Sequence, residues 1–267
     1  MNSIRFGGQT YAWYMSYDRY VGKIGHILDI CKKGGLTGLE VETVMLRDYF
    51  EDGPALKALF DERGMLLAAL AVPIGWGVVP RHEIDVIVDK SIALGDTFPG
   101  LLLSLGILPP SEPFMNVAQE QKLFLEYVTQ ISKKACEKGL KVSFHTNSSK
   151  ASLFRTEAEY DVLYEWLCKS DIGFTPDAGH IARGDMDVLK IFQRFAPYIR
   201  HVHFKDMTSS REWAQMGEGC IDFKGIVRIL RQAGYDGWIV VEEESSEALS
   251  NPDDSMLVDA AFMRTLA

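Results

Sequence analysis

Cysteine is scarce in this chain, and long apolar runs are missing. The 267 residues include four cysteines, which lie far apart and form no CxxC pair. Reduced thiols in a cytoplasmic protein are the simplest interpretation, so a disulfide-stapled secreted domain is disfavoured. The longest apolar stretch, MLLAALAVPIGWGVV, is too short to cross a bilayer and contains a proline, so we expect no membrane span.

An excess of basic residues is missing too. The formal net charge is -9, whereas a sequence-independent grip on nucleic acid needs a basic face. We therefore expect no nucleic-acid partner, although a local basic patch is compatible with that charge. The opening residues MNSIRFGGQTYAW lack a basic segment followed by an apolar core, so we expect no secretory leader.

Linkers, low-complexity tracts and sequence repeats are absent as well, and what the chain has is a regular alternation of short apolar and longer amphipathic segments. Such alternation predicts a parallel sheet with helical crossovers. About eight such units in roughly 250 residues predict a single-domain (β/α)8 TIM barrel over residues 1–267. The alternative, a doubly wound open sheet, is weakened because no glycine-rich turn follows the first strand. The eight expected strands are IRFG near Ile4 and the segments ending at Glu42, Val72, Leu105, Thr146, Asp177, Asp206 and Glu244.

The sequence predicts the secondary structure of one unit clearly and leaves that of another open. DFKGIVRILRQAGYDG predicts a helix with Asp222 as its N-cap and Gly234 at its end. The fourth unit, DTFPGLLLSLGILPPSEPF, contains four prolines and could be a long loop rather than a regular strand.

Polar side chains cluster where the expected strands end, which is the active-site edge of a barrel. In RHVHFKD, strand alternation places His201, His203 and Lys205 on one face. Because neighbouring strands lie about 4.8 Å apart, several strand ends can share one ion. Taken singly, Asp177 could equally be a helix cap, and His201 a packed histidine. The strand-end groups are Glu40 and Glu42, His145 and Asn147, Asp177 and His180, His201 to Asp206, and Glu242 to Glu244.

These segments resemble the xylose isomerase-like TIM barrels, a family that includes sugar isomerases and epimerases, endonuclease IV and inosose dehydratases. The resemblance covers most of the chain and is best from about Gly139 to Glu244. The matching stretches are TGLEVE, TPDAGH, RHVHFKD, GEGCIDFKGIVRILRQAGYDGW and VVEEE, and the last three together are similar to the inosose dehydratase branch.

The resemblance implies metal ligands at His145, Asp177, His203 and Glu242, and a substrate-side histidine at His180. One position departs from the isomerases and epimerases, which have a glutamate that is both ligand and base where this chain has His145. The dehydratase branch often has His-x-His there, whereas this chain has His-Thr-Asn. With one carboxylate fewer, the catalytic base would be Glu242, His180 or Lys205.

A ligand set of two nitrogens and two oxygens suits one divalent metal, with Mn²⁺ preferred and Co²⁺, Fe²⁺ or Zn²⁺ also suitable. The expected chemistry is enolisation of a small-molecule keto-sugar or keto-cyclitol, leading to isomerisation, epimerisation or dehydration. Lys205 is expected at the rim, where it would reach the substrate. The expected substrate-binding residues are Glu40, Asn147, His180, Lys205 and Trp13, with Trp76 as a second candidate for a sugar-stacking wall.

Two other functions stay open. The chain could be a non-catalytic metal- or sugar-binding barrel that has lost its base. An endonuclease IV-like repair enzyme is disfavoured, because that branch uses more metal ligands and a basic face. The chain has six histidines and a net negative charge. The sequence also leaves open whether the protein forms a homo-oligomer.

Overall fold

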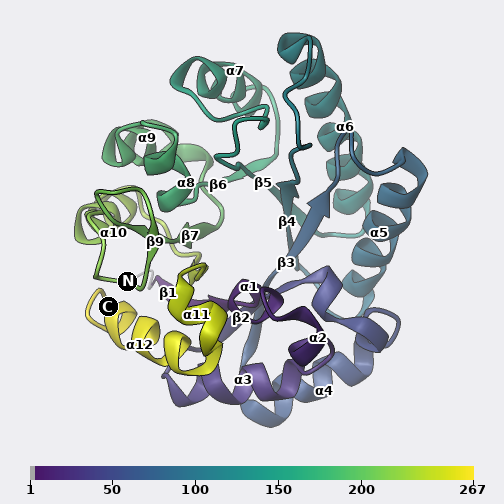
Figure 1. The fold of residues 1–267 in the computed structure, drawn as a ribbon. Helices are drawn as coiled ribbons and strands as arrows, with labels where there is room; N and C mark the ends of the chain where they lie inside the picture. The colour runs from purple at the N-terminus through teal and green to yellow at the C-terminus, as the bar shows by residue number, and fades with distance from the viewer. Residues whose placement is uncertain (1–3) are drawn as a thin grey trace.

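The computed structural model describes residues 4–267. Eight parallel strands form an inner barrel, and the helices surround it (Figure 1). The hydrogen-bonded order is β6-β5-β4-β3-β2-β1-β10-β7, so the predicted TIM barrel is confirmed. The strands are β1 Arg5–Gln9, β2 Gly38–Glu42, β3 Leu66–Ile74, β4 Leu102–Ile107, β5 Lys141–His145, β6 Gly173–Thr175, β7 Val202–Phe204 and β10 Trp238–Val241.

Backbone contacts between β6 and β7 close the barrel. The backbone N–H of Arg200 donates to the carbonyl of Phe174, and that of His203 donates to the carbonyl of Pro176, both at 3.0 Å. The second contact forms part of a parallel bridge between Asp177 and His203. Closure therefore brings two of the predicted ligands side by side.

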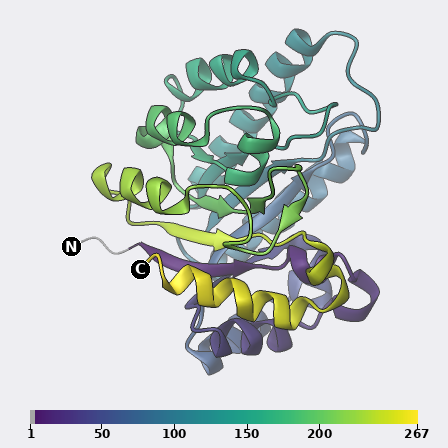
Figure 2. The same cartoon turned by 60° about the vertical axis from the view of Figure 1, so that its left-hand side comes forward.

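The outer layer follows the strand-helix alternation of the sequence. In Figure 2, the C-terminal helix α12 runs alongside β1, and the C-terminus lies on the same side of the barrel as the start of β1. A small hairpin, β8 Asp206–Met207 and β9 Trp213–Ala214, follows β7. The helices are α1 Tyr11–Tyr14, α2 Tyr17–Tyr20, α3 Ile24–Lys33, α4 Gly53–Arg63, α5 Arg81–Ala93, α6 Val117–Glu137, α7 Glu157–Leu167, α8 Ala178–Arg183, α9 Val188–Phe195, α10 Phe223–Gln232, α11 Ser246–Ser250 and α12 Pro252–Arg264. Among residues 4–267, no helix combines the length and apolarity that a membrane crossing requires.

Local sequence signals explain several of these boundaries. The Asp222 side chain accepts a hydrogen bond from the backbone N–H of Gly225 at 2.8 Å, so the predicted N-cap of α10 is confirmed. The fourth unit contains both features that its sequence left open: β4 is a regular strand, and the proline-containing loop 108–116 follows it.

Alternation along the strands separates the apolar layer from the polar interior. In β2, Leu39 and Val41 are fully buried in the hydrophobic core between strands and helices. Glu40 and Glu42, on the other face, line a cavity inside the barrel. In a barrel, alternate residues of each strand face the interior and the surrounding helices, which explains this pattern.

Candidate metal centre

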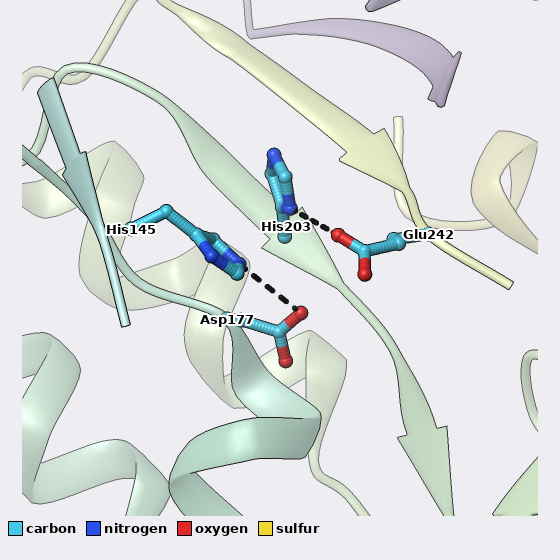
Figure 3. Close-up of side chains that lie close together, drawn as sticks. All are labelled: His145, Asp177, His203 and Glu242. Atoms are coloured by element: carbon cyan, nitrogen blue, oxygen red, sulfur yellow. Dashed lines mark hydrogen bonds and ion pairs between the residues drawn. The ribbon is translucent and has the colours of Figure 1, made fainter. Parts of the chain in front are cut away.

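Four ligand-type side chains meet at the carboxyl ends of four neighbouring strands (Figure 3). Each of His145, Asp177, His203 and Glu242 offers one donor atom, and these atoms all lie within 4.8 Å of one another. Nε2 of His145 is 3.7 Å from Oδ2 of Asp177, and Nδ1 of His203 is 2.6 Å from Oε2 of Glu242. The structure thus brings together the four residues that the sequence singled out as ligands.

Two ligand atoms of this quartet have no hydrogen-bond partner among the described residues. Nε2 of His145 and Oδ2 of Asp177 are buried and form no hydrogen bond there. Burying a polar atom without a partner is costly, so such atoms usually mark a ligand. Two imidazoles and two carboxylates are suitable ligands for a divalent transition ion. The side chains present therefore fit a metal.

Asp177 has a structural role as well as a place in the quartet. Its Oδ1 accepts a hydrogen bond from the backbone N–H of His180 at 2.7 Å, which caps α8. That bond leaves Oδ2 facing His145. The two interpretations of Asp177 from the sequence, helix cap and ligand-type residue, are therefore compatible.

A buried carboxylate below the quartet fixes the ring of His203. Oε2 of Glu40 accepts hydrogen bonds from Nε2 of His201 at 2.5 Å and from Nε2 of His203 at 2.8 Å. Burial opposes the charge on Glu40, but the two histidines outweigh it and lower its pKa to about 2. Burial likewise opposes protonation of His203, but Glu40 and Glu242 together raise its pKa well above the ordinary value. His201 therefore acts on His203 through Glu40.

Lys205 is buried against two carboxylates of the cavity lining. Its side chain is 1% exposed, and Nζ donates to Oε1 of Glu242 at 2.6 Å and to Oε1 of Glu244. Burial opposes the charge, but Glu242 and Glu244 outweigh it and hold the Lys205 pKa well above the ordinary value. Lys205 is therefore a buried ammonium group, and its expected contact with a substrate stays a prediction. Its two partners, Glu242 and Glu244, both line the cavity.

His180 lies beside this ammonium group and is neutral. Nζ of Lys205 donates to Nε2 of His180 at 3.2 Å, so Nδ1 of His180 donates to Oγ of Ser148 at 2.8 Å. Burial, followed by the charge of Lys205, lowers the pKa of His180 to about 3. A histidine fixed in one neutral tautomer can hold a substrate group but does not gain a proton near neutral pH.

A cavity of about 100 Å³ opens above these groups. The predicted substrate residues Glu40, Asn147 and His180 line it. Asn147 accepts a hydrogen bond at Oδ1 from the backbone of Ser149 at 2.7 Å. The full lining is Tyr11, Glu40, Glu42, Ala71, Val72, Pro73, Ser104, Gly106, Ile107, Leu108, His145, Asn147, His180, His203, Glu242 and Glu244.

The structure does not place the two predicted tryptophans at the cavity. Trp13 is completely buried in the hydrophobic core, where its Nε1 donates to Oδ1 of Asp253 at 2.7 Å. Trp76 packs against other aromatic rings and also lies outside the cavity lining. The aromatic side chains near the site are Tyr11, which lines the cavity, and Trp213, whose ring centroid is 5.5 Å from that of His180.

Glu42 is the carboxylate that the sequence noted at a strand end without giving it a role. It lines the cavity, and Nε2 of Gln9 donates to its Oε1 at 3.0 Å. Burial, followed by the charges of Glu242 and Glu40, raises its pKa to about 8. The sequence contained a signal for this position: Glu42 follows Glu40 by two residues in TGLEVE, and strand alternation therefore places both side chains on the inner face.

Residues 28–266 match the model of a family described as xylose isomerase-like TIM barrel. An inosose dehydratase of Clostridium beijerinckii is 30% identical over 152 residues, which cover 50% of this chain and 50% of the relative. The chain thus spans about half the length of the curated relatives that match first. Another inosose dehydratase, from Glaesserella parasuis serovar 5, is 29% identical over 94% of this chain and 83% of its own length.

Solved structures share the fold at low sequence identity. The crystal structure of IOLI protein with a zinc atom superposes with a TM-score of 0.82 at 15% identity and covers 98% of each chain. D-psicose 3-epimerase from Clostridium cellulolyticum H10, solved with D-tagatose, gives 0.77 at 16% identity, over 98% of this chain and 97% of the other.

Proposed function

The chain belongs to the xylose isomerase-like TIM barrel family, and we propose on that premise that it is a metal-dependent enzyme that enolises a keto-sugar or keto-cyclitol. The main support is the buried quartet, in which Nε2 of His145 and Oδ2 of Asp177 have no hydrogen-bond partner among the described residues. Glu42, a carboxylate outside that quartet, faces the same cavity.

We propose that His145, Asp177, His203 and Glu242 hold one divalent ion, with Mn²⁺ preferred and Zn²⁺, Co²⁺ or Fe²⁺ also suited to these ligands. When bound, such an ion supplies electrophilic polarisation of a ketone oxygen and of an adjacent hydroxyl. His203 would offer Nδ1, because its Nε2–H is donated to Glu40. A histidine ligand whose second N–H is held by a carboxylate is a common arrangement in metal sites.

The proton next to the ketone would be removed by Glu42. Glu242, His180 and Lys205 were the predicted catalytic residues, but all three already have hydrogen-bond partners. Glu242 is bonded to His203 and Lys205. His180 is bonded to Lys205 and Ser148. A carboxylate with a pKa of about 8 can both take and return a proton near neutral pH. In this proposal Lys205 balances the charge of Glu242, and His180 and Asn147 orient the substrate.

Dehydration of a keto-cyclitol is the more specific form of the proposal, because the curated relatives are named inosose dehydratases. Loss of the α-proton to Glu42 would be followed by loss of a β-hydroxyl as water, which gives an unsaturated ketone. Isomerisation or epimerisation is the second candidate, because the enediolate left after proton loss to Glu42 could take the proton back at another carbon or on the other face of the same carbon.

A substrate panel tests the proposal. Keto-sugars and keto-cyclitols would be incubated with the Mn²⁺-loaded protein in D₂O and followed by NMR, with the His203→Ala variant as control. Deuterium uptake with loss of water supports dehydration, and uptake with a new sugar epimer or isomer supports the second candidate. Metal binding without any exchange contradicts enolisation and favours the non-catalytic binding barrel.

A cytoplasmic location is also part of the proposal. It is supported by the four cysteines, which are all free thiols in the structure. One domain over residues 1–267 remains a prediction, as does the absence of a nucleic-acid partner.

A further inference from the structure

A second and larger cavity lies at the opposite end of the barrel. Its volume is about 790 Å³, and it opens where the strands begin. Arg5, Lys141 and Trp238, the first residues of β1, β5 and β10, line it. It is separate from the candidate metal centre, which occupies the carboxyl ends of the strands.

Two glycines make room for the larger side chains of this cavity. A Cβ atom at Gly38 would lie 2.5 Å from the ring of Trp238, and one at Gly173 would lie 2.3 Å from the side chain of Arg200. Both distances are shorter than any real contact, so an alanine at either position would displace the ring or the arginine. The tryptophan and the arginine therefore lie across the strand ends because β2 and β6 begin with glycine.

The charges around this cavity are unbalanced. Lys57 pairs with Asp61 at 2.6 Å, but within residues 4–267 neither Arg5, Lys141 nor Arg200 forms an ion pair. The guanidinium of Arg5 lies 4.4 Å from the centroid of the Trp238 ring, and Arg200 donates only to backbone carbonyls. The whole chain has a net charge of -9, whereas cationic side chains outnumber anionic ones around the opening of this cavity. The charged lining residues are Arg5, Lys57, Lys141, Arg200, Asp61 and Asp236.

An unpaired polar atom lies deeper in the same cavity. His201 lines the cavity although it is 1% exposed. Its Nε2 donates to Glu40, whereas its Nδ1 has no hydrogen-bond partner among the described residues. Because Nε2 carries the proton, Nδ1 is a hydrogen-bond acceptor, and a buried acceptor without a partner fits an ordered water or a hydroxyl group of a ligand beside it. This observation is independent of the charge at the rim.

We propose that the cavity at the N-terminal end of the barrel binds a small organic anion. Its carboxylate or phosphate groups would pair with Arg5, Lys141 and Arg200, and its carbon body would lie on Trp238 and the neighbouring apolar residues. The site is distinct from the proposed active site and does not depend on the proposed reaction. It is connected to that active site through His201, whose partner Glu40 also holds His203.

Calorimetry on the full-length protein tests this proposal without any activity measurement. Four probes separate the two anion chemistries: citrate, inorganic pyrophosphate, a hexose bisphosphate and ATP, each titrated at about 0.1 M salt to limit non-specific attraction. The test variant is Arg5→Gln with Lys141→Gln, which removes two exposed cations. The matched control is Lys57→Gln, which removes a cation from the same lining that is already paired with Asp61.

We expect at least one probe to bind at a single saturable site, about tenfold more weakly in the double variant and within about twofold of wild type in the control. Tighter binding of citrate identifies a carboxylate ligand, and tighter binding of the phosphorylated probes identifies a phosphate ligand. No binding of any probe up to about 5 mM, or equal binding by wild type and double variant, would overturn the proposal. If thermal melting shows that the double variant is unfolded, the same comparison is made with the single variant Lys141→Gln.

Discussion

Nε2 of His203 lies 2.8 Å from Oε2 of Glu40, and this bond turns Nδ1 of the same ring toward Glu242. A deeply buried carboxylate thus orients a residue of the candidate metal centre. Because His201 donates to the same oxygen of Glu40, it supports that orientation from one layer further down the barrel. The two histidines of RHVHFKD therefore have different tasks.

The first prediction separates these tasks. His203→Ala should weaken Mn²⁺ binding by more than about 100-fold, because it removes a ligand, whereas His201→Ala should cost only about tenfold, because it loosens Glu40. Competition with a fluorescent chelator measures both affinities. A larger loss for His201→Ala would show that the ligand assignment in β7 is wrong by two residues.

His145 should determine the metal preference. His145→Glu would make the quartet more anionic, so its affinity for Mg²⁺ should rise relative to Mn²⁺ by about tenfold. The metal affinity of the variant should also fall less steeply below about pH 6, because protons compete with the metal at one imidazole ligand instead of two. Equal metal preference and equal pH dependence in wild type and variant would mean that His145 does not bind the metal.

Glu42 should be needed for proton transfer but not for metal binding. Glu42→Gln keeps the side-chain shape and should lower α-proton exchange by about 100-fold or more, while Mn²⁺ affinity stays within a few-fold of wild type. Deuterium uptake and chelator competition measure the two properties separately. Ser104→Ala is the matched control, because it removes another polar side chain of the cavity lining that has no part in the proposed reaction. Wild-type exchange in Glu42→Gln would assign the base to another residue.

A buried acid outside the site should make stability depend on pH. Burial and the neighbouring Glu243 raise the pKa of Asp259 well above its usual value. Between the unfolded and the folded pKa, the folded protein binds one more proton, so stability falls as pH rises. Asp259→Asn cannot ionise and should gain stability relative to wild type above about pH 4, by at most about 1.4 kcal/mol per pH unit.

Urea unfolding between about pH 4 and pH 8 measures this difference. The control is Asp171→Asn, a change at an exposed position that should leave stability close to that of the wild type. A constant difference between Asp259→Asn and wild type across this range would contradict a raised pKa at Asp259.

Strand periodicity predicted the barrel and a cluster of polar side chains at its rim, and the family resemblance indicated which four of them would be ligands. In TGLEVE and RHVHFKD, every second residue faces inward, and the carboxyl ends of parallel strands share one rim. His145, Asp177, His203 and Glu242 therefore had to converge once the strands formed a closed ring. The closure through Phe174 and Pro176 does not depend on any special side chain.

The errors occurred where the chain leaves the strands. Tyr11 and Trp13 lie on the short helix α1, and residues two apart on a helix point to nearly opposite sides. Periodicity could not say which ring faces the cavity, and the structure places Tyr11 there. Strand register fixes only the Cβ of Lys205, so the sequence could not predict that its long side chain would be buried against Glu242 and Glu244.

The cavity at the N-terminal end also could not be predicted from the sequence. Arg5, Lys141 and Arg200 are widely separated along the chain and converge only when the barrel closes. Gly38 and Gly173 give no signal by themselves, because their importance lies in the side chains that pack against them.

The central claim is that four strand ends share one divalent ion. The most direct measurement is an anomalous difference map from crystals grown with Mn²⁺ and recorded on both sides of its absorption edge. The account predicts one strong peak about 2.0–2.3 Å from donor atoms of His145, Asp177, His203 and Glu242. A fully ordered site with no peak between these four side chains, or a peak bound by other residues, would contradict it.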